Sequence, residues 1–169
     1  YEMAGSGPAI MLLHGAGQNR NEWRRTQFIQ RLSPNFTVIA VDLRGNGESD
    51  KPTKPEAFAL ERLAEDLLAV ADDAGVQRFH VWGFAYGAVI ARSLAATSDR
   101  VRSLVHIGYP LGEPATGHYK EAVSGFIARW QPIIADEEAG KLDKSKLSPG
   151  DYEALTKGGV KLAVAWQTA

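Results

Sequence analysis

The sequence predicts an α/β fold in which a doubly wound, mostly parallel sheet is followed by a helical lid. Three observations support this fold class. Four short apolar runs have the length of strands, helical segments alternate with them over residues 1–108, and residues 109–169 contain no strand-like run. Such alternation is typical of parallel sheets with right-handed crossovers. We therefore expect a core at 1–108 and an incomplete helical lid or cap segment at 109–169.

The predicted strands are short runs with few polar residues, as expected where both faces of a strand are covered. They are residues 9–13, 36–41, 79–82 and 101–107. Each is followed by a polar or small residue, namely His14, Asp42, Gly83 or Gly108. The sheet would be partial, because residues 1–3 resemble only the tail of an earlier strand.

Helices are predicted between the strands at residues 22–32, 56–74 and 86–97. The second has the clearest pattern, because its leucines and alanines fall on one face and Gly75 is placed to end it. The third is apolar almost all round, which indicates a helix buried on several sides. In the lid, residues 119–131 form an amphipathic segment that Pro132 interrupts. Ser148 and Pro149 predict the start of a last helix.

The composition excludes several classes of protein. The chain has 169 residues, 19 Lys and Arg against 20 Asp and Glu, and 44% apolar residues. The near-zero net charge argues against nucleic-acid binding, and the apolar content argues against disorder. Without cysteine there is no Cys-ligated metal centre, and no apolar run is long enough to span a membrane. We expect no cofactor, no metal, no nucleic-acid or membrane partner, and a cytoplasmic location.

Three of the four strand ends carry motifs rich in small residues. They are residues 14–19 (HGAGQN), 42–49 (DLRGNGES) and 83–87 (GFAYG). Ligands of an open α/β sheet bind outside the carboxyl ends of its strands, so we expect the three motifs to form one site.

The third motif has the spacing of a nucleophile elbow, a strained strand-to-helix turn that raises one side chain above the sheet. Gly83 and Gly87 leave room where strand and helix approach each other. The raised position is Ala85, which has no nucleophilic group. We interpret it as the replacement of a serine in preference to an aspartate, and as engineered rather than lost in the lineage, because the surrounding motif is intact. The alternative is an ordinary tight turn.

Backbone amides beside the elbow are candidates for an oxyanion hole, which needs two donors aimed at developing charge. We assign them to Ala16, after the first strand, and to Tyr86, where a helix begins and its dipole favours negative charge. His14 is interpreted as holding loops together rather than transferring protons. Asp42 and Arg44 are interpreted as organising their own loop and not as catalytic residues.

Together the motifs resemble those of the α/β-hydrolase superfamily, in particular its lid-bearing esterase, lactonase, dehalogenase and epoxide-hydrolase branch. The resemblance covers residues 1–108 and is carried by 14–17, 42–52 and 83–88. It implies serine-type hydrolysis of a small ester or lactone, in which a serine at position 85 attacks and the amides of Ala16 and Tyr86 hold the oxyanion. The family's acid and histidine follow the lid, so we expect this chain to lack them and to be catalytically dead.

The resemblance, and a start without methionine, favour an internal portion of a longer protein. His80 and His106 are expected in the core and His118 in a linker, so none is assigned as a base. Glu113 is the one candidate for a local acid. The strand at 101–107 would be left as an open edge, so we expect either a missing C-terminal portion to pair with it or the chain to self-associate.

The expected substrate is a small apolar molecule that resembles an ester. Its binding residues are assigned to Gly17, Phe84, Phe126 and Trp130, with Trp166 as a further candidate. The lid aromatics among them also fit simple packing of the lid.

Two other functions compete with this one. Gly15 and Gly17 follow a strand and Asp42 ends the next, as in a dinucleotide-binding protein. That fingerprint needs a third glycine, where this sequence has Arg20. The second alternative is a receptor-like member of the hydrolase fold that binds small molecules without catalysis, and Ala85 is the feature that favours it.

Overall fold

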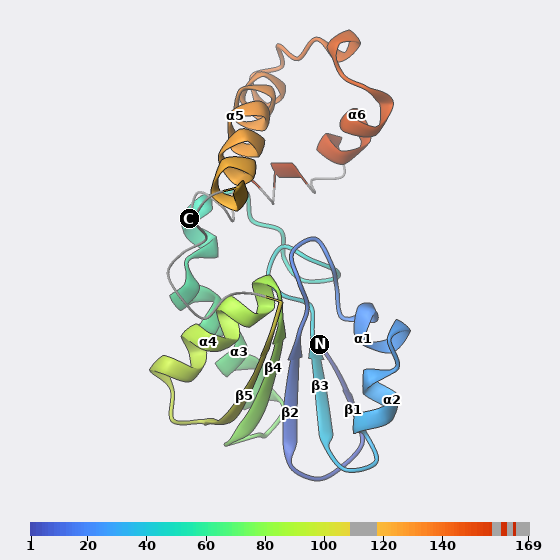
Figure 1. Ribbon diagram of the computed structural model, residues 1–169, viewed down its shortest axis with the longest axis vertical. Coiled ribbons are helices and arrows are strands. Elements are labelled where there is room, and N and C mark those ends of the chain that lie inside the picture. Colours follow the sequence, from blue (N-terminus) through green and yellow to red (C-terminus); the bar gives the residue numbers. More distant parts are fainter. Residues whose placement is uncertain (109–117, 157–159, 162–163, 165–169) are drawn as a thin grey trace. The chain divides into compact units, whose positions relative to one another are not determined.

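The computed structural model describes residues 1–108, 118–156, 160–161 and 164. They belong to two compact units, one formed by Tyr1–Pro52 with Ala59–Tyr109 and the other by Thr53–Phe58 with Pro110–Ala169. The first unit holds a five-stranded sheet in the order β1-β3-β2-β4-β5 (Figure 1). The strands are β1 (Glu2–Ala4), β2 (Ala9–Leu13), β3 (Thr37–Val41), β4 (Phe79–Phe84) and β5 (Val101–Ile107).

The sheet confirms the predicted fold class. Strands β2 to β5 pair in parallel, and β1 pairs with β3 in the antiparallel direction. All four predicted strands are present. β4 continues beyond its predicted end because Phe84 still pairs with Ile107 of β5. The strand therefore runs directly into the motif at 83–87.

Helices cover both faces of this sheet (Figure 1). They are α1 (Asn21–Arg25), α2 (Phe28–Leu32), α3 (Leu60–Asp73) and α4 (Tyr86–Thr97). The prediction of α4 is confirmed at both ends. One helix at 22–32 is wrong, because Gln27 has a left-handed φ of 64° that separates α1 from α2. The segment 56–74 is also divided, since a 3-10 turn, η1 (Pro55–Phe58), is followed by Ala59, whose ψ of 139° is extended.

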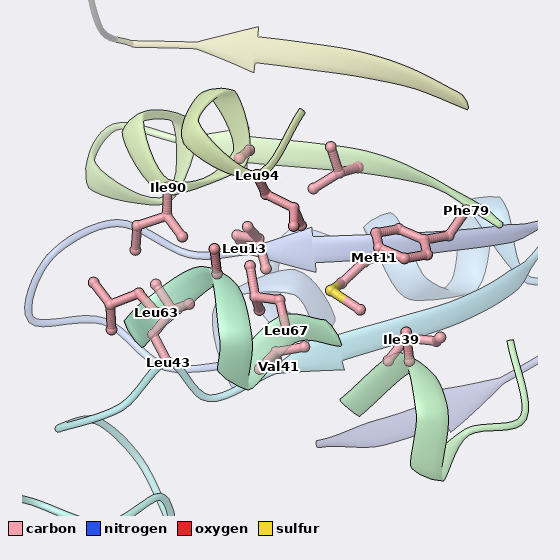
Figure 2. Packing of buried hydrophobic residues seen from close by; sticks show 14 of the residues in the cluster. Met11, Leu13, Ile39, Val41, Leu43, Leu63, Leu67, Phe79, Ile90 and Leu94 are labelled. Carbon is pink, nitrogen blue, oxygen red and sulfur yellow. The ribbon is translucent and has the colours of Figure 1, made fainter. Parts of the chain in front are cut away.

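The core of this unit lies on both faces of the sheet. On one face, side chains of β2, β3 and β4 pack against α3 and α4, with Met11, Leu67 and Ile90 completely buried (Figure 2). On the other face, Trp23 and Ile29 of the two short helices cover apolar residues of β2 and β3. Burial of one such side chain stabilises a fold by roughly 1.5–3 kcal/mol, so the strand ends are held on a rigid support.

β5 forms one edge of the sheet in the described part of the chain. Val105 and Ile107 on this strand are 37% and 42% exposed, and Phe84 on the neighbouring strand is 40% exposed. An exposed apolar edge favours pairing with another strand. Whether a further segment or a second copy pairs here stays a prediction.

The second unit is helical where the structure describes it. It contains α5 (His118–Glu138), a 3-10 turn η2 (Lys144–Lys146) and α6 (Pro149–Thr156). The predicted start of α6 is confirmed, because Ser148 Oγ accepts a hydrogen bond from the N–H of Asp151 at 3.1 Å. The rest of the predicted last helix, toward Trp166, falls mostly outside the described residues.

The predicted interruption at Pro132 is wrong, because α5 continues through it. A proline inside a helix removes one backbone hydrogen bond and costs about 3 kcal/mol. Here Ile133 and Ile134 follow the proline and pack with Trp130 into one apolar cluster, which keeps the helix continuous. No helix among the described residues is long and apolar enough to cross a membrane.

Candidate active site

The motif at 83–87 forms the sharp turn that its spacing predicts. Ala85 has φ 49° and ψ −114°, between the end of β4 and the start of α4. A non-glycine residue in such a conformation costs about 1–3 kcal/mol and persists only where its surroundings impose it. The N–H of Ala85 donates to the carbonyl of Ile107 at 2.8 Å, and its own carbonyl accepts from Ala88 at 3.0 Å. The turn therefore has the strained backbone of an elbow rather than that of an ordinary turn.

Two glycines give this elbow the space that it needs. A methyl group on Gly83 would lie 2.4 Å from the carbonyl oxygen of Gly87. A methyl group on Gly87 would lie 2.5 Å from the carbonyl oxygens of both Leu13 and His14. These distances are far inside van der Waals contact, so any Cβ at either position would push strand and helix apart. The elbow is wedged against the end of β2, where the first motif begins.

The first motif lies directly beside the elbow. A methyl group on Gly15 would lie 3.4 Å from the methyl of Ala85, so residue 85 faces the loop that follows β2. In this loop the N–H of Gly15 donates to Gln18 Oε1 at 2.9 Å, whereas that of Ala16 donates to no other described residue. Tyr86 begins α4, and burial raises the pKa of its phenol to about 12. The oxyanion role of the Ala16 and Tyr86 amides stays a prediction.

His14 holds this loop in place, as its position predicts. The residue is 1% exposed. Its Nε2 accepts a hydrogen bond from the N–H of Leu43 at 3.1 Å, and its Nδ1 lies 2.8 Å from the carbonyl oxygen of Gly15. These contacts fit a neutral ring with its proton on Nδ1, and burial lowers the pKa of the ring. Because both nitrogens are used in loop contacts, His14 has none left to transfer a proton.

Asp42 and Arg44 also organise loops at this edge of the sheet. Asp42 is 3% exposed and accepts hydrogen bonds from the backbone N–H groups of Arg20 and Glu48. Arg44 forms a two-bond ion pair with Asp66 of α3. The Asp42 carboxylate is therefore buried and occupied by protein donors. This argues against the dinucleotide-binding alternative, in which an acid at this place would bind a ribose.

A pocket of about 280 Å³ opens beside the first motif. Its aromatic walls include Trp23, Phe28 and Phe84, and His14 and Gln18 also line it. The rings of Trp23 and Phe28 meet edge to face with centroids 5.6 Å apart. The structure thus brings Phe84, which directly precedes the elbow residue, to an apolar cavity. Substrate binding by Phe84, and by the nearby loop glycine at position 17, stays a prediction.

The predicted lid residues lie in the second unit. Trp130 is 4% exposed and packs with Leu155, and Phe126 contacts the same cluster. Packing within that unit accounts for both rings, and their role in substrate binding stays a prediction. Glu113 and Trp166 lie outside the described residues.

The expected core placement of two histidines is wrong. His80 is half-buried, and its Nδ1 lies 2.8 Å from Ser103 Oγ on the neighbouring strand. His106 is also half-buried, and its Nε2 has no hydrogen-bond partner among the described residues. Both are on the two strands nearest the sheet edge, where side chains have fewer neighbours. His118 begins α5 rather than lying in a linker. In the described part of the chain, no group of three His, Asp or Glu is placed to hold a metal ion.

Comparison with protein families adds the deciding observation. Residues 8–149 match the family model described as the alpha/beta hydrolase fold. The chain belongs to the α/β-hydrolase fold family. The matched range includes all three motifs at the strand ends, so the resemblance inferred from them is confirmed.

Curated relatives of this member of the fold family include named enzymes. Epoxide hydrolase 3 from Siraitia grosvenorii is 33% identical over 152 residues, which are 85% of this chain and 48% of that protein. Epoxide hydrolase 1 from the same species is 30% identical over 153 residues, again 85% of this chain and 48% of the relative. The chain spans about half the length of these curated relatives.

Solved structures of similar fold carry different names. Epoxide hydrolase from Vigna radiata superposes with a TM-score of 0.71 at 22% identity, covering 98% of this chain and 66% of that one. Bottromycin epimerase, solved in complex with Bottromycin A2, has a TM-score of 0.70 at 27% identity, covering 96% and 64%. One of these proteins is named a hydrolase and the other an epimerase, so the shared fold does not by itself fix the reaction.

Two features of this site are not predicted by the sequence. Arg20 was considered only as an obstacle to a dinucleotide site, whereas it pairs with Asp42 across 22 positions of sequence. The aromatic pair Trp23 and Phe28 was not singled out as a pocket wall. Both depend on contacts between distant segments, for which the spacing of residues gives no signal.

Proposed function

We propose that this chain carries the elbow and oxyanion side of a site for a small uncharged molecule with an electrophilic carbon, an ester, lactone or epoxide. In the sequence as given, the site binds such a molecule without hydrolysing it through residue 85. The observation that carries the proposal is Ala85 in the strained backbone of an elbow. Its methyl group has no lone pair and no ionisable group, so no covalent intermediate can form on it.

The proposed parent chemistry is serine-type hydrolysis of an ester or lactone. A serine Oγ at position 85 attacks the carbonyl carbon and gives its proton to a histidine. The carbonyl oxygen takes up the electron pair, and the N–H groups of Ala16 and Tyr86 stabilise it by about 3–4 kcal/mol each. Collapse of this intermediate expels the alcohol, which takes the proton back from the histidine. Water then attacks the acyl-serine and gives a proton to the histidine, and the serine oxygen takes that proton as the carboxylic acid is released.

An aspartate is the other nucleophile that position 85 could hold. Its carboxylate would attack an epoxide carbon, the ring C–O bond would break, and the alkoxide would take a proton from an acid or from water. Water would then hydrolyse the resulting ester. The relatives named epoxide hydrolases favour this substrate class, whereas the ester and lactone assignments rest on the motifs. In either case the aromatic pocket at Phe84 would receive the apolar part of the substrate.

Restoring each nucleophile in the complete protein tests the proposal. Ala85→Ser and Ala85→Asp are assayed with p-nitrophenyl acetate and with styrene oxide. The unchanged protein is expected to match the buffer rate with both substrates, and one variant is expected to turn over its matched substrate well above that rate. Ala85→Gly is the control, because it alters the same position without adding a nucleophile. A substantial rate in the unchanged protein that survives Ala85→Gly would overturn the proposal.

A non-catalytic binding protein is the second candidate function, and the pocket beside an alanine elbow favours it. In that case both restored variants stay at the buffer rate while the unchanged protein binds an apolar ligand. Titration with phenyl acetate, monitored by tryptophan fluorescence, measures this binding because Trp23 lines the pocket. Binding without turnover in any variant would select the receptor-like function over the enzyme.

A further inference from the structure

The loop that carries Ala16, residues 14–19 and here called the oxyanion loop, is anchored at both ends to one other segment. At its start, His14 Nε2 accepts a hydrogen bond from the N–H of Leu43. Immediately after its end, Arg20 contacts Asp42. Because Asp42 and Leu43 are adjacent at the end of β3, both anchors attach the loop to the same point of the sheet.

Arg20 makes three contacts at this point. Its backbone N–H donates to Asp42 Oδ1 at 2.7 Å, and Nη1 of its guanidinium donates to Asp42 Oδ2. Nη2 of the same guanidinium donates to Glu48 Oε2 at 2.6 Å. The side chain of Arg20 is 17% exposed and that of Asp42 is 2% exposed, so solvent screens the pair little.

Asp42 is itself fixed by the loop that follows β3. The N–H of Glu48 donates to Asp42 Oδ2 at 3.0 Å, and Ser49 Oγ donates to the Asp42 carbonyl at 2.6 Å. Gly47 lies against the carboxylate, since a methyl group there would be 2.2 Å from Asp42 Cγ. Burial alone would raise the pKa of Asp42, but the two N–H donors and the charge of Arg20 outweigh burial and lower it. Arg20 therefore binds a carboxylate that hydrogen bonds from its own loop already hold in place.

We infer that Arg20 is a positioning residue that sets the direction of the Ala16 N–H toward the elbow by holding the end of the oxyanion loop on Asp42 and Glu48. The inference rests on the proposed function, because the direction of the Ala16 N–H matters only if this group stabilises an oxyanion. Donors of this kind act only when they are held close to the productive geometry. Helix α1 provides little support of its own, since it has 5 residues and no side-chain cap.

Amide hydrogen exchange tests this role in the unchanged Ala85 protein, without any need for turnover. Arg20→Met removes the guanidinium and keeps an apolar stem. The amides of Gly15 and Gln18, which hydrogen-bond within the loop, are expected to exchange at least about tenfold faster, while amides of β2 and β4 keep their rates. Arg24→Met is the control, because Arg24 on the neighbouring helix forms an ion pair with Glu2 and makes no contact with Asp42, so its loss should leave the loop unchanged.

Two results would overturn the inference. Loop exchange that stays within about twofold of the unchanged protein means that Arg20 does not hold the loop. An increase shared equally by β2 and β4 means that the ion pair only stabilises the fold. Arg20→Lys should give an intermediate increase, because a lysine keeps the charge but cannot engage Asp42 and Glu48 through one planar group.

Kinetics in a restored variant provides a second measurement. In whichever of Ala85→Ser or Ala85→Asp turns over, adding Arg20→Met is expected to lower kcat about tenfold with KM nearly unchanged, and Arg24→Met should alter neither. A raised KM at constant kcat would contradict positioning of a transition-state donor. If neither restored variant turns over, the proposed function fails and the exchange result alone decides the role of Arg20.

Discussion

The elbow and the oxyanion loop are neighbours, yet they are held by different forces. The elbow is held mainly by close packing, because strand and helix approach so closely at Gly83 and Gly87 that neither position has room for a Cβ. The loop is held by hydrogen bonds and charge, through His14 at one end and Arg20 at the other. The shape of the elbow therefore does not depend on the side chain at position 85, which explains how an alanine keeps a strained backbone. The loop depends on the protonation and pairing of its anchors.

The largest effect on stability is expected at the close contact between the elbow and the end of β2. Gly87→Ala should lower the free energy of unfolding by about 3 kcal/mol, because the new methyl would meet two carbonyl oxygens of β2 and its following loop at 2.5 Å. Urea unfolding measures the change. Gly125→Ala in α5 is the control, since nothing lies within 4 Å of a methyl added there. Equal effects of the two substitutions would show that α4 can shift and that the elbow is not wedged.

An intermediate effect is expected from pH at the oxyanion loop. Burial lowers the pKa of His14, so in acid the unfolded chain binds a proton that the folded chain does not. The stability that neutral His14 contributes is complete above about pH 6.5 and is lost as the pH falls from there toward the lowered pKa, by at most about 1.4 kcal/mol per pH unit. Urea unfolding at a series of pH values measures this slope. His14→Asn should flatten it, and an unchanged slope in that variant would assign the pH dependence to other groups.

The smallest effect, and one of opposite sign, is expected at the elbow residue itself. Ala85→Gly should stabilise the fold by about 1 kcal/mol, because relief of roughly 1–3 kcal/mol of strain exceeds the extra flexibility of glycine in the unfolded chain. Ala96→Gly is the control on the exposed side of α4, where the same change should destabilise by about 1 kcal/mol. If both substitutions destabilise alike, the backbone at position 85 carries no strain.

Local patterns predicted those parts of the fold that local forces determine. The apolar runs predicted β2 and β3 most clearly, because both strands are buried on both faces and contain almost no polar residues. Helix α4 was predicted at both ends because an apolar segment begins directly after Ala85, the raised residue of the elbow. The continuity of α5 through Pro132 was not predicted, since the residues around the proline pack against Leu155, which is distant in sequence. The break at Gln27 was not predicted either, because no glycine or proline marks it in the sequence.

The same distinction applies to the site. The elbow could be predicted because two glycines at fixed spacing are a steric requirement that the sequence displays. The sequence predicted that His14 holds loops together, but it did not predict the partner, because Leu43 contributes only a backbone N–H. Arg20 was missed because its carboxylate partners belong to another strand end. Polar contacts between separate loops produce no periodic pattern in a sequence, so they cannot be predicted from it.

The alanine at the elbow also has a consequence at the level of the gene. Every alanine codon becomes a serine codon through a single-base change, and alanine codons that end in a pyrimidine become aspartate codons equally directly. Because the turn imposes its own backbone, either nucleophile would arrive on a scaffold that is already shaped to present it. The chain is therefore a natural starting material for directed evolution, in which selection can compare rival chemistries at one codon without first having to create a fold.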